Sequence, residues 1–347
     1  MIAVVKTVQE IYGQPDTWRV CLRELHRLNL EGLVGDRQPS EFQWVFVGCG
    51  TSYYLAQAAA ASFTLLTGKL ARALPASEIL LYPELSLPSP ESAFPVLISR
   101  SGHTSEVLVV ANILREKGLE FMALTCDGNE LATSTRRVLQ LPVREESTVM
   151  TGSFTSMLLA MQFVAARLAG NEEFLTELDQ LPALVESLLT KYGPQLEKFA
   201  QRHFVDVAVL GQGALYPIAS EVALKVMESS SSYAQYFHTL EFRHGPKSII
   251  DDRALVIGLI SDACAERELK VLREMKELGA STIAIINRAT PEARKAADLL
   301  VELSSSQLPL TLLITYVVWG QLFGSYVGIA KGLNPDEPTN LTRVVTF

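Results

Sequence analysis

The sequence predicts an α/β protein made of two tandem, doubly wound parallel-sheet domains with flanking helices. Short apolar runs, each followed by a turn and a helical pattern, recur along the chain, which is typical of a parallel sheet with helices on both faces. This pattern then repeats after a helical middle. A shift of 162 positions relates Ser99 to Ser261, and a shift of 163 relates Gly48 to Gly211. A nearly constant shift indicates a duplicated domain.

The predicted organisation has five parts. With 347 residues, the chain is long for one hydrophobic core and comfortable for two. In order, the parts are an N-terminal helical segment (1–40), a first sheet domain (41–170), a helical connector (171–203), a second sheet domain (204–333) and a C-terminal tail (334–347).

In the first half, each short apolar run is expected to be a buried strand and each following periodic segment a helix. Pro15 and Asp16 are typical of a helix start, and we expect a helix from Thr17 to about Leu30. The elements that follow are a strand at 44–47, a turn at 48–52, a helix at 53–68, a strand at 94–98, a turn at 99–105, a helix at 106–117 and a strand at 121–125.

The middle of the chain is predicted to be helical, and the second half repeats the strand–turn–helix unit. Pro217 fits a first helical turn, where the N–H that proline lacks would be unpaired anyway. The apolar run Leu308–Ala330 contains Pro309, Gln321 and several Gly and Tyr, which favours a buried helix over a membrane span. The other expected elements are helices at 153–169 and 171–203 and strands at 205–210, 255–260 and 282–286. Three more helices are expected in the second half: one that begins near residue 217, one that ends at 279 and one that ends at 303.

Composition limits the class of protein. Apolar residues make up 48% of the chain and charged residues 20%, as in soluble globular proteins. A net charge of -8, with no basic run, argues against a nucleic-acid partner. The four cysteines lie far apart without a CxxC pair, and no secretory signal stands out, so free thiols and a cytoplasmic location are expected.

Two strand-to-helix turns are rich in hydroxyl groups. Helix N-termini favour anions, and Ser and Thr hydroxyls donate short hydrogen bonds to phosphate oxygens, so a phosphomonoester site is predicted here. Hydroxyl groups that only cap the helices are the alternative. The second half has Ser-Asp-Ala-Cys-Ala-Glu (261–266) where the first has a hydroxyl-rich turn, so we infer one anion site per chain. The residues concerned are Thr51 and Ser52 in one turn and Ser99, Ser101, Thr104 and Ser105 in the other.

A third feature is a charged stripe on a helix that otherwise reads as buried. Glu221, Lys225 and Glu228 lie at i, i+4 and i+7 and share one face. Downstream, His244 precedes Gly245-Pro246, a pair that holds a defined turn and presents the imidazole. A carboxylate, an ammonium and a histidine suit proton transfer at a carbon beside a carbonyl. A solvated surface ion pair and an ordinary turn histidine are the alternatives.

Taken together, these motifs resemble those of the sugar isomerase (SIS) double-domain family, whose domains are flavodoxin-like. The resemblance covers essentially the whole chain, and the order and spacing of the motifs are specific. The chain is similar to the isomerase domain of glucosamine-6-phosphate synthase and, more closely, to stand-alone amino-sugar-phosphate deaminase/isomerases. The motifs are EIYGQP, GCGTSY, SRSGHTSE, EESTVMTGSFTSM, GQGALYPIASEVALKVMESS, EFRHGP and NPDEPTNLTRVV.

The resemblance implies a role for each matching residue. Glu228 would move a proton between C1 and C2, supported by Lys225 and Glu221. His244 would open the sugar ring in the neighbouring subunit of a homodimer. The tail would close over the substrate, with Arg343 where the synthase has a lysine; a frayed end is the alternative for this segment. The substrate phosphate would be held by Gly50, Thr51, Ser52, Ser99, Arg100 (through its backbone N–H), Ser101 and Thr104.

The chain also departs from the synthase pattern. No glutaminase domain precedes the sugar domain in this sequence, and we expect no release of ammonia from glutamine by the chain itself. Arg343 keeps a positive charge but excludes chemistry that needs a neutral amine. No metal or organic cofactor is expected. The role of His103 and the identity of the sugar stay open.

The expected activity is therefore that of a phosphosugar isomerase, and most specifically of an amino-sugar-phosphate deaminase/isomerase that releases ketose phosphate and ammonia. A fructosamine-phosphate deglycase and a simple aldose–ketose phosphate isomerase use the same steps and remain alternatives. A non-catalytic phosphosugar-binding regulator is an alternative of another class. Residues 1–40 are too short for a DNA-binding module and carry no basic excess, which disfavours that class.

Overall fold

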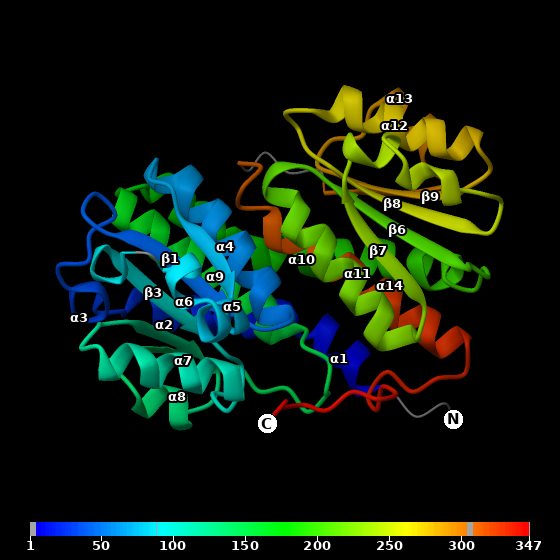
Figure 1. Ribbon diagram of the computed structural model, residues 1–347. Helices are drawn as coiled ribbons and strands as arrows, with labels where there is room; N and C mark the ends of the chain where they lie inside the picture. The colour runs from blue at the N-terminus through cyan, green and yellow to red at the C-terminus, as the bar shows by residue number, and fades with distance from the viewer. Residues whose placement is uncertain (1–4, 88, 304–307, 347) are drawn as a thin grey trace. The chain divides into compact units, whose positions relative to one another are not determined.

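The computed structural model describes residues 5–87, 89–303 and 308–346 (Figure 1). Parts of the expected 1–40, 204–333 and 334–347 segments lie outside these residues. The chain forms two compact units. The first unit comprises the described residues of Asp16–Glu145, Gly152–Asp179 and Thr342–Phe347, and the second those of Met1–Pro15, Glu146–Thr151 and Gln180–Leu341.

The first unit is built on a parallel five-stranded sheet in the order β2-β1-β3-β4-β5, which confirms the predicted fold class. The edge strands β2 and β5 were not predicted. They are short and half-exposed, and so lack the apolar run that identifies a buried strand. The strands are β1 (Gln43–Gly48), β2 (Arg72–Pro75), β3 (Ala93–Ile98), β4 (Met122–Thr125) and β5 (Arg137–Gln140).

Successive side chains of β1 point to opposite faces of this sheet and pack against helices on both. Trp44 stacks on Phe63 of α4 with ring centroids 4.6 Å apart, while Val45 packs on the opposite face in the cluster that contains Val107 of α7. Helix α2, most of which belongs to this unit, starts at Gln14 rather than Thr17, because Pro15 is tolerated in its first turn. The helices are α2 (Gln14–His26), α3 (Leu30–Val34), α4 (Thr51–Thr67), α5 (Ala76–Leu81), α6 (Pro83–Ser86), the 3-10 turn η1 (Pro90–Ser92), α7 (Ser105–Glu116), α8 (Glu130–Thr133) and α9 (Gly152–Ala169).

The second unit repeats the same topology, with the sheet order β10-β9-β8-β6-β7 and all neighbours parallel. In both units the second strand is at one edge and the first lies next to it, which supports the duplication inferred from the sequence. The helix expected to end at 303 is wrong over its last residues, because α13 ends at Ala296 and residues 299–302 form a strand. The side chains of this LLVE segment alternate between buried and half-buried, as in a strand with one face on the core. The strands are β6 (Asp206–Gly211), β7 (Tyr233–His238), β8 (Ala254–Ile260), β9 (Ser281–Ile286) and β10 (Leu299–Glu302).

Helices α12 and α13 cover one face of this sheet, and α11 with α14 cover the other (Figure 1). Within the described part of the chain, α14 is the helix long and apolar enough to cross a membrane, and 89% of it is buried inside the protein. Such burial is what a core helix shows, as the sequence predicted. The helices are α1 (Lys6–Tyr12), α10 (Glu172–Phe199), η2 (Gly213–Leu215), α11 (Tyr216–Ser230), η3 (Glu241–Arg243), η4 (Pro246–Ile249), α12 (Ala265–Glu277), α13 (Pro291–Ala296) and α14 (Leu313–Ala330).

Three glycines spaced four residues apart bring α14 into close contact with α11. A Cβ on Gly320 would lie 2.5 Å from the Val222 side chain, and one on Gly328 would lie 2.0 Å from the Ser229 carbonyl oxygen. A Cβ on Gly324 would lie 2.8 Å from the carbonyl oxygen of Lys225. The two backbones are therefore packed too closely for any side chain on this face of α14.

Gly328→Ala is expected to destabilise the protein by about 3 kcal/mol, because a methyl group would force the two helix backbones apart. Gly332→Ala is the matched control. Gly332 has φ +76° with open space around its Cβ position, so the change costs about 1 kcal/mol from backbone conformation alone. Chemical denaturation of the three proteins tests this. Equal losses for the two variants would contradict the close-packing explanation.

Candidate active site

The charged stripe predicted on α11 forms a buried cluster in the second unit. Glu221, Lys225 and Glu228 do share one face. The Lys225 Nζ lies 3.4 Å from Glu221 Oε1 and donates a hydrogen bond to Glu228 Oε2. The side chains of Glu221 and Lys225 are 0% and 1% exposed, and that of Glu228 is 14% exposed. The surface-pair alternative is therefore excluded for this cluster.

The two carboxylates keep the buried lysine charged. Burial alone would lower the pKa of Lys225, but Glu221 and Glu228 together raise that pKa above its ordinary value. Removing one partner of such a buried pair typically costs about 3–5 kcal/mol, because the other charge is left uncompensated. The cluster thus holds an ammonium against Glu228, the least buried of its three side chains.

His244 lies on a loop of the same unit. It follows η3, and its backbone N–H donates to the Glu241 carbonyl oxygen at 2.9 Å. Gly245 has φ +126°, a conformation that side-chain-bearing residues rarely adopt. The residue is exposed, so this turn presents the imidazole to solvent, as the Gly-Pro pair predicted.

In the first unit, the GCGTS turn leads directly into α4. Gly50 is the N-cap with φ +52°, and Thr51 and Ser52 are the first two residues of the helix rather than part of the turn. Both side chains are largely buried, at 7% and 6% exposure. The turn therefore brings two hydroxyl groups to a helix N-terminus at the carboxyl end of β1, which is where doubly wound sheets bind ligands.

The SRSGHTS turn between β3 and α7 is organised by its own hydroxyl groups. Ser99 Oγ lies 2.9 Å from Thr104 Oγ1 and accepts a hydrogen bond from the Gly102 N–H at 3.2 Å. Ser101 Oγ accepts from the His103 N–H at 3.2 Å. Gly102 has φ +68°, a left-handed conformation that lets the chain turn sharply at this point.

Helix capping does not account for these hydroxyl groups. At Gly50 and Thr104, the N-cap positions of α4 and α7, no side-chain cap hydrogen bond occurs in the described structure. The hydroxyl groups of Ser99, Ser101 and Thr104 bond within their own turn instead. These hydroxyl groups therefore organise the turn, and the anion-binding interpretation stays a prediction.

The corresponding turn of the second unit is occupied by a carboxylate of the chain itself. Ser261 donates to Glu268 through its backbone N–H, at 2.6 Å to Oε2, and through its hydroxyl group, at 3.0 Å. Glu268 is 1% exposed. Cys264 stands at the position of Gly102 and has φ -126°, so the left-handed turn is not formed. The single anion site inferred for the first unit stays a prediction.

Glu268→Gln is expected to gain stability relative to the unchanged protein as pH rises. Burial raises the pKa of Glu268, and the hydrogen bonds from Ser261 offset this only in part. A carboxyl group with a raised folded-state pKa makes folding less favourable as pH rises through its unfolded pKa, whereas glutamine stays neutral. Melting temperatures between about pH 4 and pH 7 measure the difference, since this window brackets ordinary carboxyl titration.

The exposed Glu266, in the first turn of α12 like Glu268, supplies the control variant Glu266→Gln. Its stability difference from the unchanged protein should vary little over the same pH range. A Glu268→Gln difference that is independent of pH, or that shifts in the opposite direction, would contradict the assignment of a disfavoured buried carboxylate.

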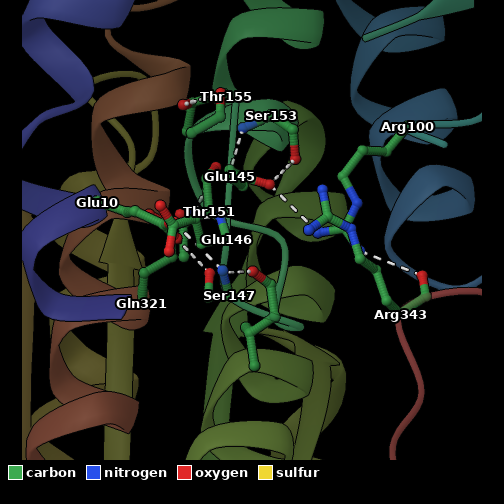
Figure 2. Close-up of polar contacts among 12 residues, drawn as sticks. Glu10, Arg100, Glu145, Glu146, Ser147, Thr151, Ser153, Thr155, Gln321 and Arg343 are labelled. Atoms are coloured by element: carbon green, nitrogen blue, oxygen red, sulfur yellow. Dashed lines mark hydrogen bonds and ion pairs between the residues drawn. The ribbon is translucent and has the colours of Figure 1, made fainter. Parts of the chain in front are cut away.

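Arg100, predicted to lend a backbone N–H to phosphate, also has a structured side chain. Its guanidinium is buried, lies 3.2 Å from Glu145 Oε2 and donates to the carbonyl oxygen of Arg343 at 3.2 Å (Figure 2). Arg343, predicted to act through its side chain, is exposed. No local pattern in the sequence pointed to Glu145 as a partner, because the pairing joins residues 45 positions apart.

The EIYGQP, EEST and tail motifs make hydrogen bonds within the second unit. Glu10 accepts from the backbone N–H of Glu146 at 2.5 Å and from Ser147 (Figure 2). Gln14 donates to Gln321 at 2.7 Å. Asp336 of the tail accepts from the backbone N–H groups of residues 6 and 7 and so caps α1. The tail is therefore not a frayed end at this point.

The side chains of the described ranges 5–87, 89–303 and 308–346 form no obvious metal centre. No group of three or more His, Cys, Asp and Glu side chains is placed there to hold a metal ion.

The family model for the SIS domain matches residues 40–167 and 200–322. These two matches contain the sheets of the first and second units and both strand-to-helix turns described above. The duplication seen in the topology is thus also a duplication of one domain family.

Known proteins resemble the whole chain. The glutamine–fructose-6-phosphate aminotransferase [isomerizing] of Pyrobaculum aerophilum is 28% identical over 355 residues, covering 98% of this chain and 57% of that protein. The chain thus spans little more than half the length of the curated relatives it matches. A glucosamine-6-phosphate deaminase from Thermotoga maritima aligns over 99% of this chain and 100% of its own, with a TM-score of 0.81 and 26% identity. A tagatose-6-phosphate ketose/aldose isomerase from Escherichia coli shares the fold, with a TM-score of 0.86 and 23% identity over 100% of this chain and 97% of its own.

Proposed function

Because the chain belongs to the SIS-domain family, we propose that it is a phosphosugar isomerase that moves a proton between C1 and C2 of a sugar 6-phosphate. More specifically, we propose an amino-sugar-phosphate deaminase/isomerase, which releases ketose phosphate and ammonia. The likeness to the Thermotoga maritima glucosamine-6-phosphate deaminase, at 26% identity over 99% of this chain, supports the specific form.

The observation that carries the proposal is the buried cluster on α11. Glu228 is the partly exposed member of three charged residues and is held by an ammonium that is 1% exposed. An ion pair that only stabilises the fold can be fully buried, whereas a general base must be accessible to its substrate. The partial exposure of Glu228 therefore favours the role of a base. The ammonium of Lys225 orients this carboxylate, and Glu221 balances the ammonium from the other side.

Substrate binding is assigned to the hydroxyl-rich turns of the first unit. Gly50, Thr51 and Ser52 at α4, with the Ser99–Thr104 turn before α7, offer backbone N–H and hydroxyl donors to a phosphate dianion. Binding through the phosphate holds the sugar without constraining C1 and C2, so that remote binding energy assists the chemistry.

The proposed reaction proceeds in balanced steps. His244 assists ring opening by moving a proton between the ring oxygen and the C1 hydroxyl group. Glu228 removes the proton from C2 and returns it to C1 through an enolamine, while Lys225 and Arg343 stabilise the developing negative charge. With an amino group at C2, the product is a ketimine, to which water adds; ammonia then leaves and the ketose phosphate forms. With a hydroxyl group at C2, the same transfer gives a ketose directly.

Proton NMR in deuterated water with glucosamine 6-phosphate, with ammonia assayed in parallel, tests this function. The unchanged protein is expected to incorporate deuterium at C1 or C2 and to release ammonia. Glu228→Gln should lower the rate by at least about a thousandfold, because the base is lost while the shape and the partner of Lys225 are kept. Glu266→Gln, an exposed change, should leave the rate unchanged.

Other outcomes separate the alternatives. Exchange without ammonia indicates an aldose–ketose isomerase, or a deglycase that needs a larger amine on the sugar; a glycated amine phosphate then distinguishes the two. Tight binding of the sugar phosphate without exchange indicates a regulator. Turnover that survives Glu228→Gln would show that the catalytic assignment is wrong.

We further propose a cytoplasmic homodimer in which His244 serves the site of the neighbouring subunit. The exposure of His244 on a fixed turn supports a role in the neighbouring subunit. The four cysteines are free thiols, as in a reducing compartment, which supports the cytoplasmic location. No nucleic-acid or membrane partner is included in the proposal.

Mixing two inactive variants tests the sharing of His244. When Glu228→Gln and His244→Asn proteins are unfolded, mixed in equal amounts and refolded, half of the dimers are mixed, and one of their two sites regains both groups. Activity should return to roughly a quarter of that of the unchanged protein, as expected for a symmetric dimer. If both groups act within one subunit, the mixture stays inactive.

A further inference from the structure

We propose that Arg100 is a positioning residue whose side chain fastens the C-terminal tail to the phosphate-binding turn. The proposal rests on the function proposed above, in which the Ser99–Thr104 turn binds phosphate, and it adds how the tail is held there. In this proposal the backbone of Arg100 forms part of the phosphate-binding turn, and its guanidinium holds the tail.

The guanidinium lies in a buried polar cluster of the first unit. The side chains of Arg100 and Glu145 are 7% and 3% exposed. Glu145 also accepts from Ser153, at 2.7 Å from the backbone N–H and 2.5 Å from the hydroxyl group, at the first turn of α9 (Figure 2). Three donors and a helix N-terminus therefore fix this carboxylate, which in turn fixes the plane of the guanidinium.

Another donor of the fixed guanidinium is directed at the tail. Arg100 Nη2 lies 3.2 Å from the carbonyl oxygen of Arg343 (Figure 2). A hydrogen bond from a charged donor is stronger than one between neutral groups. A second contact lies at the other end of the turn, where the Ser105 N–H donates to the Val345 carbonyl oxygen at 3.5 Å.

The hydrogen bonds to backbone carbonyl groups hold the tail in place, because the tail has little buried surface. Thr342, Arg343, Val345 and Thr346 are all exposed. Hydrophobic burial therefore contributes little to holding this segment, and the carbonyl groups of residues 343 and 345 carry its attachment. The position of the exposed Arg343 side chain follows from where its own carbonyl group is held.

The main chain of Arg100 is held independently of its side chain. Its carbonyl oxygen accepts from Thr125 Oγ1 and from the Cys126 N–H, both at 3.1 Å, where β4 ends. Replacing the side chain therefore leaves the path of the turn unchanged. Lysine keeps the charge but has no planar fork that reaches a carboxylate and a carbonyl oxygen together, so Arg100→Lys removes the fastening selectively.

Hydrogen exchange by mass spectrometry on the ligand-free protein tests the fastening directly. The informative amide is that of Ser105, which donates to the Val345 carbonyl oxygen, and we call its exchange rate tail exchange. In Arg100→Lys, tail exchange should speed up by at least about tenfold, while peptides of the sheet keep their protection. Calorimetry with inorganic phosphate should give a Kd within about twofold of the unchanged value, because the backbone and hydroxyl donors remain.

Arg137→Lys is the matched control. Arg137 also joins a carboxylate and a carbonyl oxygen in the first unit, with Nη2 2.9 Å from Glu120 and Nη1 3.4 Å from the Leu33 carbonyl oxygen. It makes no proposed contact with the tail, so tail exchange should stay unchanged. If Arg100→Lys folds poorly, the double variant Arg100→Gln with Glu145→Gln removes both buried charges and should release the tail in the same way.

Unchanged tail exchange in both Arg100 variants would overturn the proposal. A loss of phosphate affinity of about tenfold or more with a protected tail would also overturn it and would make the guanidinium a phosphate ligand. With a substrate that is turned over, kcat should fall while KM stays within about threefold. The exchange experiment needs no substrate, so a failed isomerase assay of the unchanged protein would count against the proposed function alone.

Discussion

The close packing of α11 against α14 is the constraint on which the candidate chemistry depends. Glycines at 320, 324 and 328 bring the two backbones together, with Gly324 against the carbonyl oxygen of Lys225. The Lys225 side chain is 1% exposed. A buried ammonium is stable only beside carboxylates, and a helix can supply them at the i-4 and i+3 positions. The Glu-x3-Lys-x2-Glu spacing follows from that requirement. Under the proposed function, Glu228, at the less buried end of the stripe, is the carboxylate that acts on the substrate.

The duplication shows how one fold supports two different tasks. Helices α4 and α11 follow equivalent strands, yet α4 begins with hydroxyl groups and α11 carries the charged cluster. The turns that follow β3 and β8 differ in the same manner. Gly102 adopts a left-handed conformation, whereas Cys264 at the equivalent position has φ -126°, and Ser261 donates to Glu268. Under the proposed function, one copy of the domain therefore binds phosphate and the other transfers the proton.

The sequence predicted most of the central strands, because each is a continuous apolar run between a turn and a helix. It missed β2, β5, β7 and β10, which lie at sheet edges and are more exposed than the central strands. The cluster on α11 was predictable because helical spacing alone puts its members on one face. The partners of Arg100 were not. Glu145 and the Arg343 carbonyl group are brought to it by the fold, and no local pattern encodes a contact over 243 positions.

Much of the resemblance that identified the family comes from motifs that support the fold rather than perform chemistry. Glu10 holds the backbone of Glu146 and Ser147, Gln14 bonds to Gln321, and Asp336 caps α1. Gln321 in turn donates to the Thr151 carbonyl oxygen, so that the segment before α9 is fixed from two sides. A protein could keep these contacts and change its substrate, since none of them involves the hydroxyl-rich turns or α11. The motifs therefore establish the fold, while the choice among deaminase, isomerase and deglycase depends on the residues that meet the C2 substituent.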